Sequence, residues 1–90
     1  MRFALITKDK PGALQVRMDN RAAHLAYIED TGVVEMAGPF LDEDGQMCGS
    51  LIVLEVADIA AAQAWAAGDP YAKAGLFEEV ILNEWKKVIG

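Results

Sequence analysis

The order of the predicted elements indicates an α+β protein with the ferredoxin-like βαββαβ arrangement and an antiparallel sheet. Short runs rich in strand-forming residues occur four times along the 90 residues. Two segments with helical periodicity lie between them, one after the first strand and one after the third. Only the second and third strands are joined directly, by a short loop. This order is that of the split βαβ motif.

The first third of the chain is predicted to form a strand and then the main helix. Residues 2–7 are a run of strand formers that ends at the turn cluster 9–12. From residue 13 to about residue 30 the pattern is helical, and Gly32 ends it. A cap at Asp19 or Asn20 would separate a leading turn from the main helix. The apolar stripe of this helix consists of Met18, Ala22, Leu25 and Ile28.

The middle of the chain is predicted to form a hairpin. Residues 33–37 form strand two, which Gly38 and Pro39 are expected to stop. Residues 41–46 are an acidic, turn-rich loop. Residues 49–56 form the clearest strand, because its centre is apolar on both faces, as in a strand that is buried from both sides.

The last third is predicted to contain a helix, a helical turn and the final strand. Asp58 caps an alanine-rich helix over residues 59–67. A second helix start follows at Asp69 and Pro70. Proline at the first helical position has no N–H to lose, and the carboxylate before it accepts from the first turn. Strand four is expected over residues 76–88.

Length, charge and cysteine content restrict the class of protein. We expect residues 1–90 to form a single domain. A net charge of −6 argues against nucleic acid and anionic membranes as partners, since both need clustered Lys and Arg. One cysteine fits a reducing compartment, and no segment is long enough for a signal peptide or a membrane span. These features predict a cytoplasmic protein.

One face of the predicted sheet has no helix to cover it. One set of strand side chains is expected to pack on the helices through Leu25, Ile28 and Trp65. The alternate residues of 51–54 and 80–82 are also apolar, and hydrophobic residues make up 53% of the chain. A second copy would cover such a face. We therefore predict a homodimer that forms sheet to sheet.

His24 and Asp69 are the residues whose positions suggest chemistry. His24 lies at the border of the apolar stripe, where a half-exposed surface histidine is the simpler interpretation. Asp69 is held at the positive end of a helix, which an N-cap role alone would explain. Cys48 has no second cysteine and is expected to be inert. One His and one Cys do not make a metal site, so no metal is expected.

Five short motifs carry a resemblance to a known family. They are RAAHL at 21–25, AGP at 37–39, GS at 49–50, AAQAW at 61–65 and DPYAKAGLF at 69–77. Each is weak alone, but five in order at plausible spacing are specific. The chain resembles the YciI-like (YCII-related) family from strand one to strand four. That family is similar in architecture to the dimeric α+β barrel proteins, which agrees with the fold argued from the residues.

The resemblance implies roles for individual residues. It places the helix-one histidine and the aspartate of the Asp-Pro-Tyr motif together in a cleft, as His24 and Asp69. A paired carboxylate would fix the imidazole tautomer and leave the other ring nitrogen as a general acid or base. Arg21, Ser50 and Tyr71 lie in the same motifs and are the candidate substrate-binding residues. No cofactor is expected.

Three functions remain open from the sequence. The leading one is a cofactor-free lyase or isomerase that transfers protons on an unknown small molecule, because a histidine and a fixed carboxylate lie in matching family motifs and no nucleophile is evident. The resemblance also implies a related enzyme, since the family includes one that acts on chlorinated hydroxyhydroquinones. The alternative is a non-catalytic module, dimeric and either ligand-binding or regulatory. A third is a cofactor-free monooxygenase-like protein, which needs an aromatic-lined pocket. Aromatic residues are only 8% of this chain.

Overall fold

The computed structural model describes all residues, 1–90, and has the predicted order of elements. A short additional helix precedes the last strand, as the Asp-Pro start signal indicated. The elements are β1 (Arg2–Asp9), α1 (Leu14–Thr31), β2 (Val34–Leu41), β3 (Met47–Glu55), α2 (Ile59–Gly68), α3 (Pro70–Lys73) and β4 (Phe77–Glu84).

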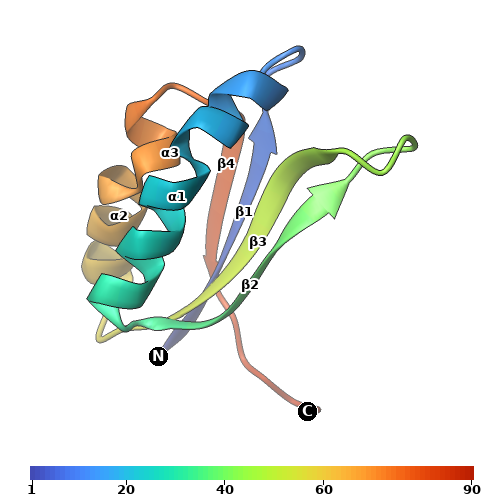
Figure 1. Cartoon of the computed structure of the whole chain (residues 1–90). Helices are drawn as coiled ribbons and strands as arrows, with labels where there is room; N and C mark the ends of the chain where they lie inside the picture. Colours follow the sequence, from blue (N-terminus) through green and yellow to red (C-terminus); the bar gives the residue numbers. More distant parts are fainter.

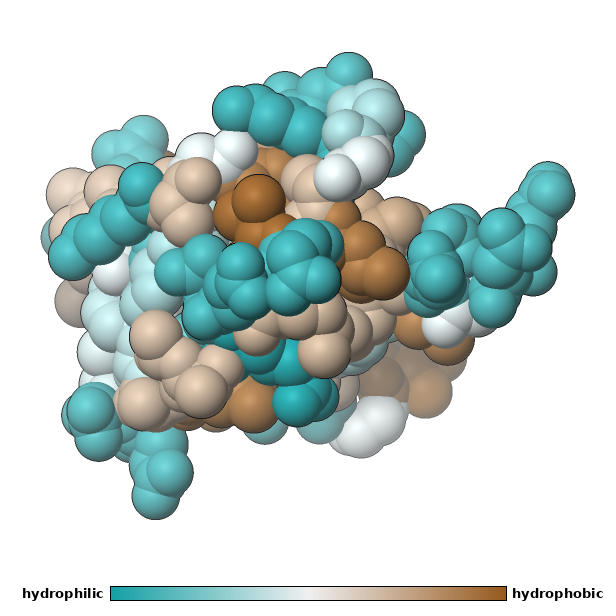
Figure 2. All heavy atoms as spheres, turned by 45° about the horizontal axis from the view of Figure 1, so that its top comes forward, coloured by the Kyte–Doolittle hydropathy of each residue, from teal (hydrophilic) through white to brown (hydrophobic).

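The molecule has two layers, an antiparallel sheet and a layer of helices on one face (Figure 1). The strand order is β2-β3-β1-β4, and every neighbouring pair is antiparallel. The β2–β3 hairpin extends beyond the helices, and its loop is the hydrophilic arm that projects beside hydrophobic surface in Figure 2. The predicted α+β, ferredoxin-like βαββαβ fold is confirmed.

The hydrophobic core lies between the centre of the sheet and α2. Its six buried residues come from β1, β3 and α2, and they are Phe3, Leu5, Ile52, Leu54, Ala62 and Trp65. The side chains of alternate strand residues point to the same face, so these β1 and β3 residues face the helices. Trp65 packs in this core from α2, as predicted.

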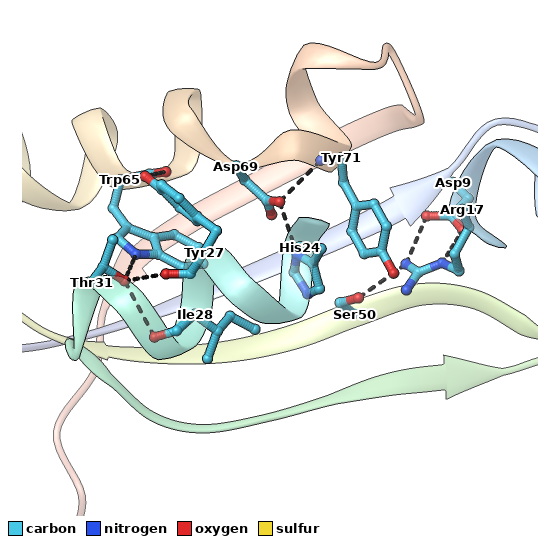
Figure 3. Close-up of polar contacts among 10 residues, drawn as sticks. All are labelled: Asp9, Arg17, His24, Tyr27, Ile28, Thr31, Ser50, Trp65, Asp69 and Tyr71. Carbon is cyan, nitrogen blue, oxygen red and sulfur yellow. Dashed lines mark hydrogen bonds and ion pairs between the residues drawn. The ribbon is translucent and has the colours of Figure 1, made fainter. Parts of the chain in front are cut away.

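Helix α1 is fixed to α2 by hydrogen bonds at the edge of this core (Figure 3). The Tyr27 hydroxyl donates to the Trp65 carbonyl at 2.9 Å, and Trp65 Nε1 donates to Thr31 Oγ1 at 2.9 Å. The rings of Tyr27 and Trp65 also pack with their centroids 4.9 Å apart. These contacts set the position of α1 relative to the end of α2, where Asp69 follows.

The predicted apolar stripe of α1 does not face the sheet, so that prediction was wrong. Met18 and Leu25 are 49% and 45% exposed, while the buried residues of α1 are Arg17 and His24. Ile28 packs against the core only in part. The most buried side chains of α1 are therefore polar, and its apolar residues Leu25 and Ile28 line a cavity instead of filling a packed core. His24, expected at a half-exposed border, is 6% exposed.

Three predicted boundaries also differ from the structure. Helix α1 has no break at Asp19 or Asn20. Strand β2 continues through Gly38 and Pro39, because it is an edge strand and a missing N–H is tolerated there. Strand β4 ends at Glu84, opposite Phe3, where its partner β1 begins.

Candidate functional site

The junction of α2 and α3 fixes Asp69 against His24 (Figure 3). Asp69 follows α2 and is the N-cap of α3, where its Oδ1 accepts from the backbone N–H of Tyr71 at 3.0 Å. The same oxygen lies 2.8 Å from His24 Nδ1. Asp69 is 1% exposed and His24 is 6% exposed. The predicted N-cap and the predicted contact are both present, and one carboxylate oxygen serves both.

This contact sets the tautomer of the imidazole. An ionised carboxylate only accepts hydrogen bonds, so Nδ1 carries the hydrogen and Nε2 of the neutral ring has a free lone pair. His24 Nε2 has no hydrogen-bond partner. Only two side-chain N or O atoms are fully buried without a partner, Thr7 Oγ1 and Asp69 Oδ2, and Nε2 is not one of them. Nε2 is therefore accessible, and His24 lines a cavity. The ring can accept a proton there.

The ring of Tyr71 packs against the face of the imidazole. Its ring stacks on that of His24 with centroids 4.0 Å apart and an interplanar angle of 16°. The guanidinium carbon of Arg17 lies 4.6 Å from the centroid of the same ring, and Tyr71 stands between the two side chains (Figure 3). Burial raises the pKa of Tyr71, and the positive charges of Arg17 and Arg21 offset part of that rise. The phenol is therefore neutral near pH 7.

Arg17 is a buried cation that the sequence analysis did not identify. It is 2% exposed and forms a bidentate pair with Asp9, with Nε 2.7 Å from Oδ2 and Nη2 3.0 Å from Oδ1. Nη2 also donates to Ser50 Oγ at 3.0 Å. Burial lowers the pKa of Arg17, but hydrogen bonding and the charge of Asp9 raise it more, so the net pKa is raised. The signal in the sequence was the spacing of Arg17, Arg21 and His24, which places them on one helix face.

A cavity of about 150 Å³ lies between α1, α3 and the β2–β3 hairpin. Half of its lining residues are hydrophobic. Arg21 contributes an exposed guanidinium that has no ion pair. The lining residues are Arg17, Arg21, His24, Leu25, Ile28, Ala37, Gly38, Pro39, Met47, Ser50, Ile52 and Tyr71. The cavity wall thus combines apolar residues with the positive charges of Arg17 and Arg21.

The structure brings four of the five predicted site residues to the wall of this cavity. Arg21, His24, Ser50 and Tyr71 line it, and Asp69 lies behind His24. Their functional roles remain predictions. Cys48 lies outside the cavity lining, half-buried, with its Sγ 3.6 Å from a backbone carbonyl oxygen. No three His, Cys, Asp or Glu side chains lie together in a way that would hold a metal ion.

Comparison with solved structures defines the class of protein. The chain is similar to 5-chloro-2-hydroxyhydroquinone dehydrochlorinase (TftG) from Burkholderia phenoliruptrix AC1100, in complex with 2,5-dihydroxybenzoquinone. The two are 40% identical with a TM-score of 0.87, over 96% of this chain and 94% of that one. An antibiotic biosynthesis monooxygenase, 13% identical over 96% and 98% of the chains, shares the fold with a TM-score of 0.56. The class is that of the dimeric α+β barrel proteins.

Sequence comparison identifies the family within this class. Residues 1–86 match the YCII-related domain family. Protein YciI of Escherichia coli O6:H1 is 36% identical over 97 residues, which cover 98% of this chain and 99% of that protein. An uncharacterized protein of Haemophilus influenzae is 30% identical over the same shares. The chain belongs to the YCII-related, or YciI-like, family, and the resemblance seen in the sequence is confirmed. None of its helices has the length and apolar character to cross a membrane.

Proposed function

We propose that this protein is a cofactor-independent lyase or isomerase that acts on a small hydroxylated ring. His24 is the general base and acid, and Asp69 orients it. The observation that carries the proposal is the 2.8 Å contact of Asp69 Oδ1 with His24 Nδ1, behind an Nε2 that is open to a cavity. The likeness to a dehydrochlorinase at 40% identity supports the reaction class.

The proposed chemistry needs only proton transfer. Nε2 removes a proton from a ring hydroxyl and returns it to the ring carbon that bears the leaving group, so the ring becomes a ketone tautomer. Nε2 then takes the proton of a second hydroxyl. The electron pair left on that oxygen forms a second carbonyl, and the leaving group departs as an anion with its bonding pair. In each step Asp69 stabilises the imidazolium, and a positioned base of this kind contributes about 10²–10⁴-fold in rate.

The size and lining of the cavity support a single ring as substrate. An engineered protein cavity of about 150 Å³ binds benzene, and the cavity here has a similar volume, about 150 Å³. The apolar residues beside His24 would contact the faces of the ring. Arg21, Ser50 and Tyr71 are proposed as substrate contacts, because each lines the cavity and carries a hydrogen-bonding group.

The test is chloride release from 5-chloro-2-hydroxyhydroquinone, with quinone absorbance as a second readout. We expect His24→Gln and Asp69→Asn to lower kcat by about 10²–10⁴-fold. Asp58→Asn is the matched control, because Asp58 is also an N-cap carboxylate but is exposed and contacts no histidine. Activity that survives in both His24→Gln and Asp69→Asn would contradict the proposal.

The alternative is a ligand-binding module without catalysis. The observation in its favour is that Tyr71, flanked by His24 and Arg17, supplies a rigid binding wall whether or not a proton is transferred. Under this alternative, 2,5-dihydroxybenzoquinone would bind, and no chlorinated or hydroxylated ring would be turned over. Calorimetric binding measured together with product analysis distinguishes the two functions.

We also propose that the protein acts as a homodimer packed sheet to sheet. The face of the sheet away from the helices carries Met36, Phe40, Leu51 and Ile81, which are 36–50% exposed. Leu51→Glu adds a charge at the centre of this face without opening the core. Sedimentation at micromolar concentration should show a dimer for the unmodified protein and a monomer for this variant. A stable, folded monomer of the unmodified protein would contradict the proposal.

The proposed place of action is the cytoplasm. The proposal is supported by the single, unpaired cysteine, Cys48, which needs no oxidising compartment. Fractionation of the producing cells, with the protein detected in the cytosolic fraction, is the test.

A further inference from the structure

A second cavity lies at the end of the sheet where β1 and β2 finish (Figure 1). Its volume is about 220 Å³, larger than the about 150 Å³ of the cavity beside His24. One wall is the turn between β1 and α1, residues 9–14, and the other is the loop and first residues of the β2–β3 hairpin. The proposed reaction gives this second cavity no role.

Hydrogen bonds fix both walls of the second cavity. In the turn after β1, the Lys10 N–H donates to the Leu76 carbonyl oxygen at 2.9 Å. In the hairpin loop, Asp42 Oδ1 accepts from the N–H groups of Asp44 and Gln46, at 2.9 Å and 3.0 Å. The second cavity is therefore bounded by two ordered loops and is formed before any ligand arrives.

The two cavities share a single lining residue, Met47. Every other lining residue belongs to one cavity alone. Met47 is the first residue of β3 and is half-buried. Its unbranched thioether side chain is of the kind that fills irregular gaps between packed elements. The side chain of Met47 is therefore the partition between the two spaces.

The two cavities lie in line along α1. Leu14, the first residue of α1, lines the second cavity, and Arg17, one turn later, donates to Ser50 in the wall of the first. His24 lies farther along the same helix (Figure 3), ten residues after Leu14, which corresponds to about 15 Å along the axis. A ligand that contacts His24 and extends toward the start of α1 therefore reaches Met47 before the second cavity.

We propose that Met47 determines specificity by limiting the ligand to one ring, and that the second cavity accepts a second ring once this side chain is shortened. The inference rests on the proposed function for the ring beside His24 and adds the limit on its size. Lys10 and Asp42 bring opposite charges to the second cavity, and Asp9 is paired with Arg17. The space therefore suits an uncharged ring rather than an ion.

The experiment measures the affinity of two hydroxyquinones by calorimetry. One is 2,5-dihydroxybenzoquinone, which has one ring, and the other is lawsone, a hydroxynaphthoquinone with a fused second ring. Met47→Ala removes the partition, and Met47→Val shortens it while keeping a strand-forming residue, in case the alanine variant is poorly folded. Met18→Ala is the matched control, because Met18 is 49% exposed on α1 and lines neither cavity.

A double variant tests where the second ring binds. Leu14 is half-buried and lines only the second cavity, so Leu14→Trp places a larger side chain in that space. Combined with Met47→Ala, it leaves the partition open but fills the space behind it. A second ring that binds anywhere else would not be affected.

We expect Met47→Ala to lower the Kd of lawsone at least about tenfold, which is about 1.4 kcal/mol. Met47→Val should lower it by a smaller factor. The Kd of 2,5-dihydroxybenzoquinone should not fall in either variant, because a single ring does not extend past Met47. Adding Leu14→Trp to Met47→Ala should return the Kd of lawsone to within about threefold of the unmodified protein. Met18→Ala should leave both affinities unchanged.

Three results would overturn the role of Met47. They are an unmodified protein that binds lawsone as tightly as Met47→Ala does, an equal gain in Met18→Ala, and a gain that survives Leu14→Trp. Affinity is measured without turnover, so failure of the proposed reaction is distinguishable. A gain of lawsone binding in Met47→Ala, together with no chloride release by the unmodified protein, would contradict the catalytic role of His24 and leave the size limit supported.

Discussion

Replacement of Asp69 can separate its role in the fold from its contact with His24. Its Oδ1 accepts from the N–H of Tyr71, as an N-cap does, and from His24 Nδ1. Asp58 provides a comparison within the same chain, because its Oδ1 accepts only from the N–H of Ala61, at 2.8 Å. We therefore expect Asp69→Ala to be more damaging than Asp58→Ala.

The expected magnitudes follow from the bonds that each carboxylate makes. Loss of an N-cap costs about 1 kcal/mol, which is the expected effect of Asp58→Ala. Asp69→Ala loses a cap and also a hydrogen bond with a charged partner, which contributes about 1.5–3 kcal/mol. The total expected for Asp69→Ala is about 2.5–4 kcal/mol. Asp69→Asn keeps an oxygen that can accept from Tyr71, so about half of that loss is expected.

Urea unfolding followed by circular dichroism measures these differences. All variants are compared at one protein concentration, because the stability of an associating protein depends on it. An Asp69→Ala variant no less stable than Asp58→Ala would show that the contact with His24 adds nothing to stability. It would also show that Asp69 Oδ1 and His24 Nδ1, 2.8 Å apart in the structure, do not form a fixed pair in solution. An equal m-value for the variants is required for the comparison.

Two further predictions concern the supports of the site. Gly68→Ala is expected to destabilise the protein by about 1–3 kcal/mol, because the new Cβ would lie 2.5 Å from the Tyr27 hydroxyl oxygen; thermal unfolding measures this, and the loss should shrink in a Tyr27→Phe background. Above about pH 10 the stability is expected to fall, because burial raises the folded-state pKa of Tyr71 and of Tyr27 above the ordinary value of 10.0. This contribution is present below that value and lost as the pH rises through the folded pKa. Urea unfolding across this range, together with tyrosinate absorbance, tests the sign, and Tyr71→Phe should flatten the dependence.

The fold could be predicted because local signals and the fold agree. Asp58 and Asp69 begin helices where the capping rules place them, and Gly32 ends α1 with a φ of 66°, the left-handed conformation that glycine favours. The end of the edge strand β2 was less predictable. Whether Pro39 stops a strand depends on whether its missing N–H would face a partner, and that depends on the order of strands in the sheet.

The site could be predicted only in part, because two of its members resemble ordinary surface residues in the sequence. Arg17 precedes the RAAHL motif, and although its spacing places it on the helix face of His24, that spacing does not show that Arg17 is buried. Its partner Asp9 lies in the segment that was interpreted as a turn. The pair forms because β1 and α1 are joined by a short loop, so that the end of the strand meets the first turns of the helix. Such proximity follows from the tertiary structure and not from periodicity.

The orientation of α1 is the feature that connects stability and function in this chain. A helix over a sheet normally directs apolar residues inward, but the buried residues of α1 are Arg17 and His24. The core is instead made by the sheet and α2, so α1 is held by polar and stacked contacts at both ends, through Arg17 with Asp9 and Tyr27 with Trp65. The space under α1 that a packed core would have filled is the cavity, which Leu25 and Ile28 also line. Packing under α1 is therefore incomplete, and the cavity that results has a histidine and an arginine on its wall.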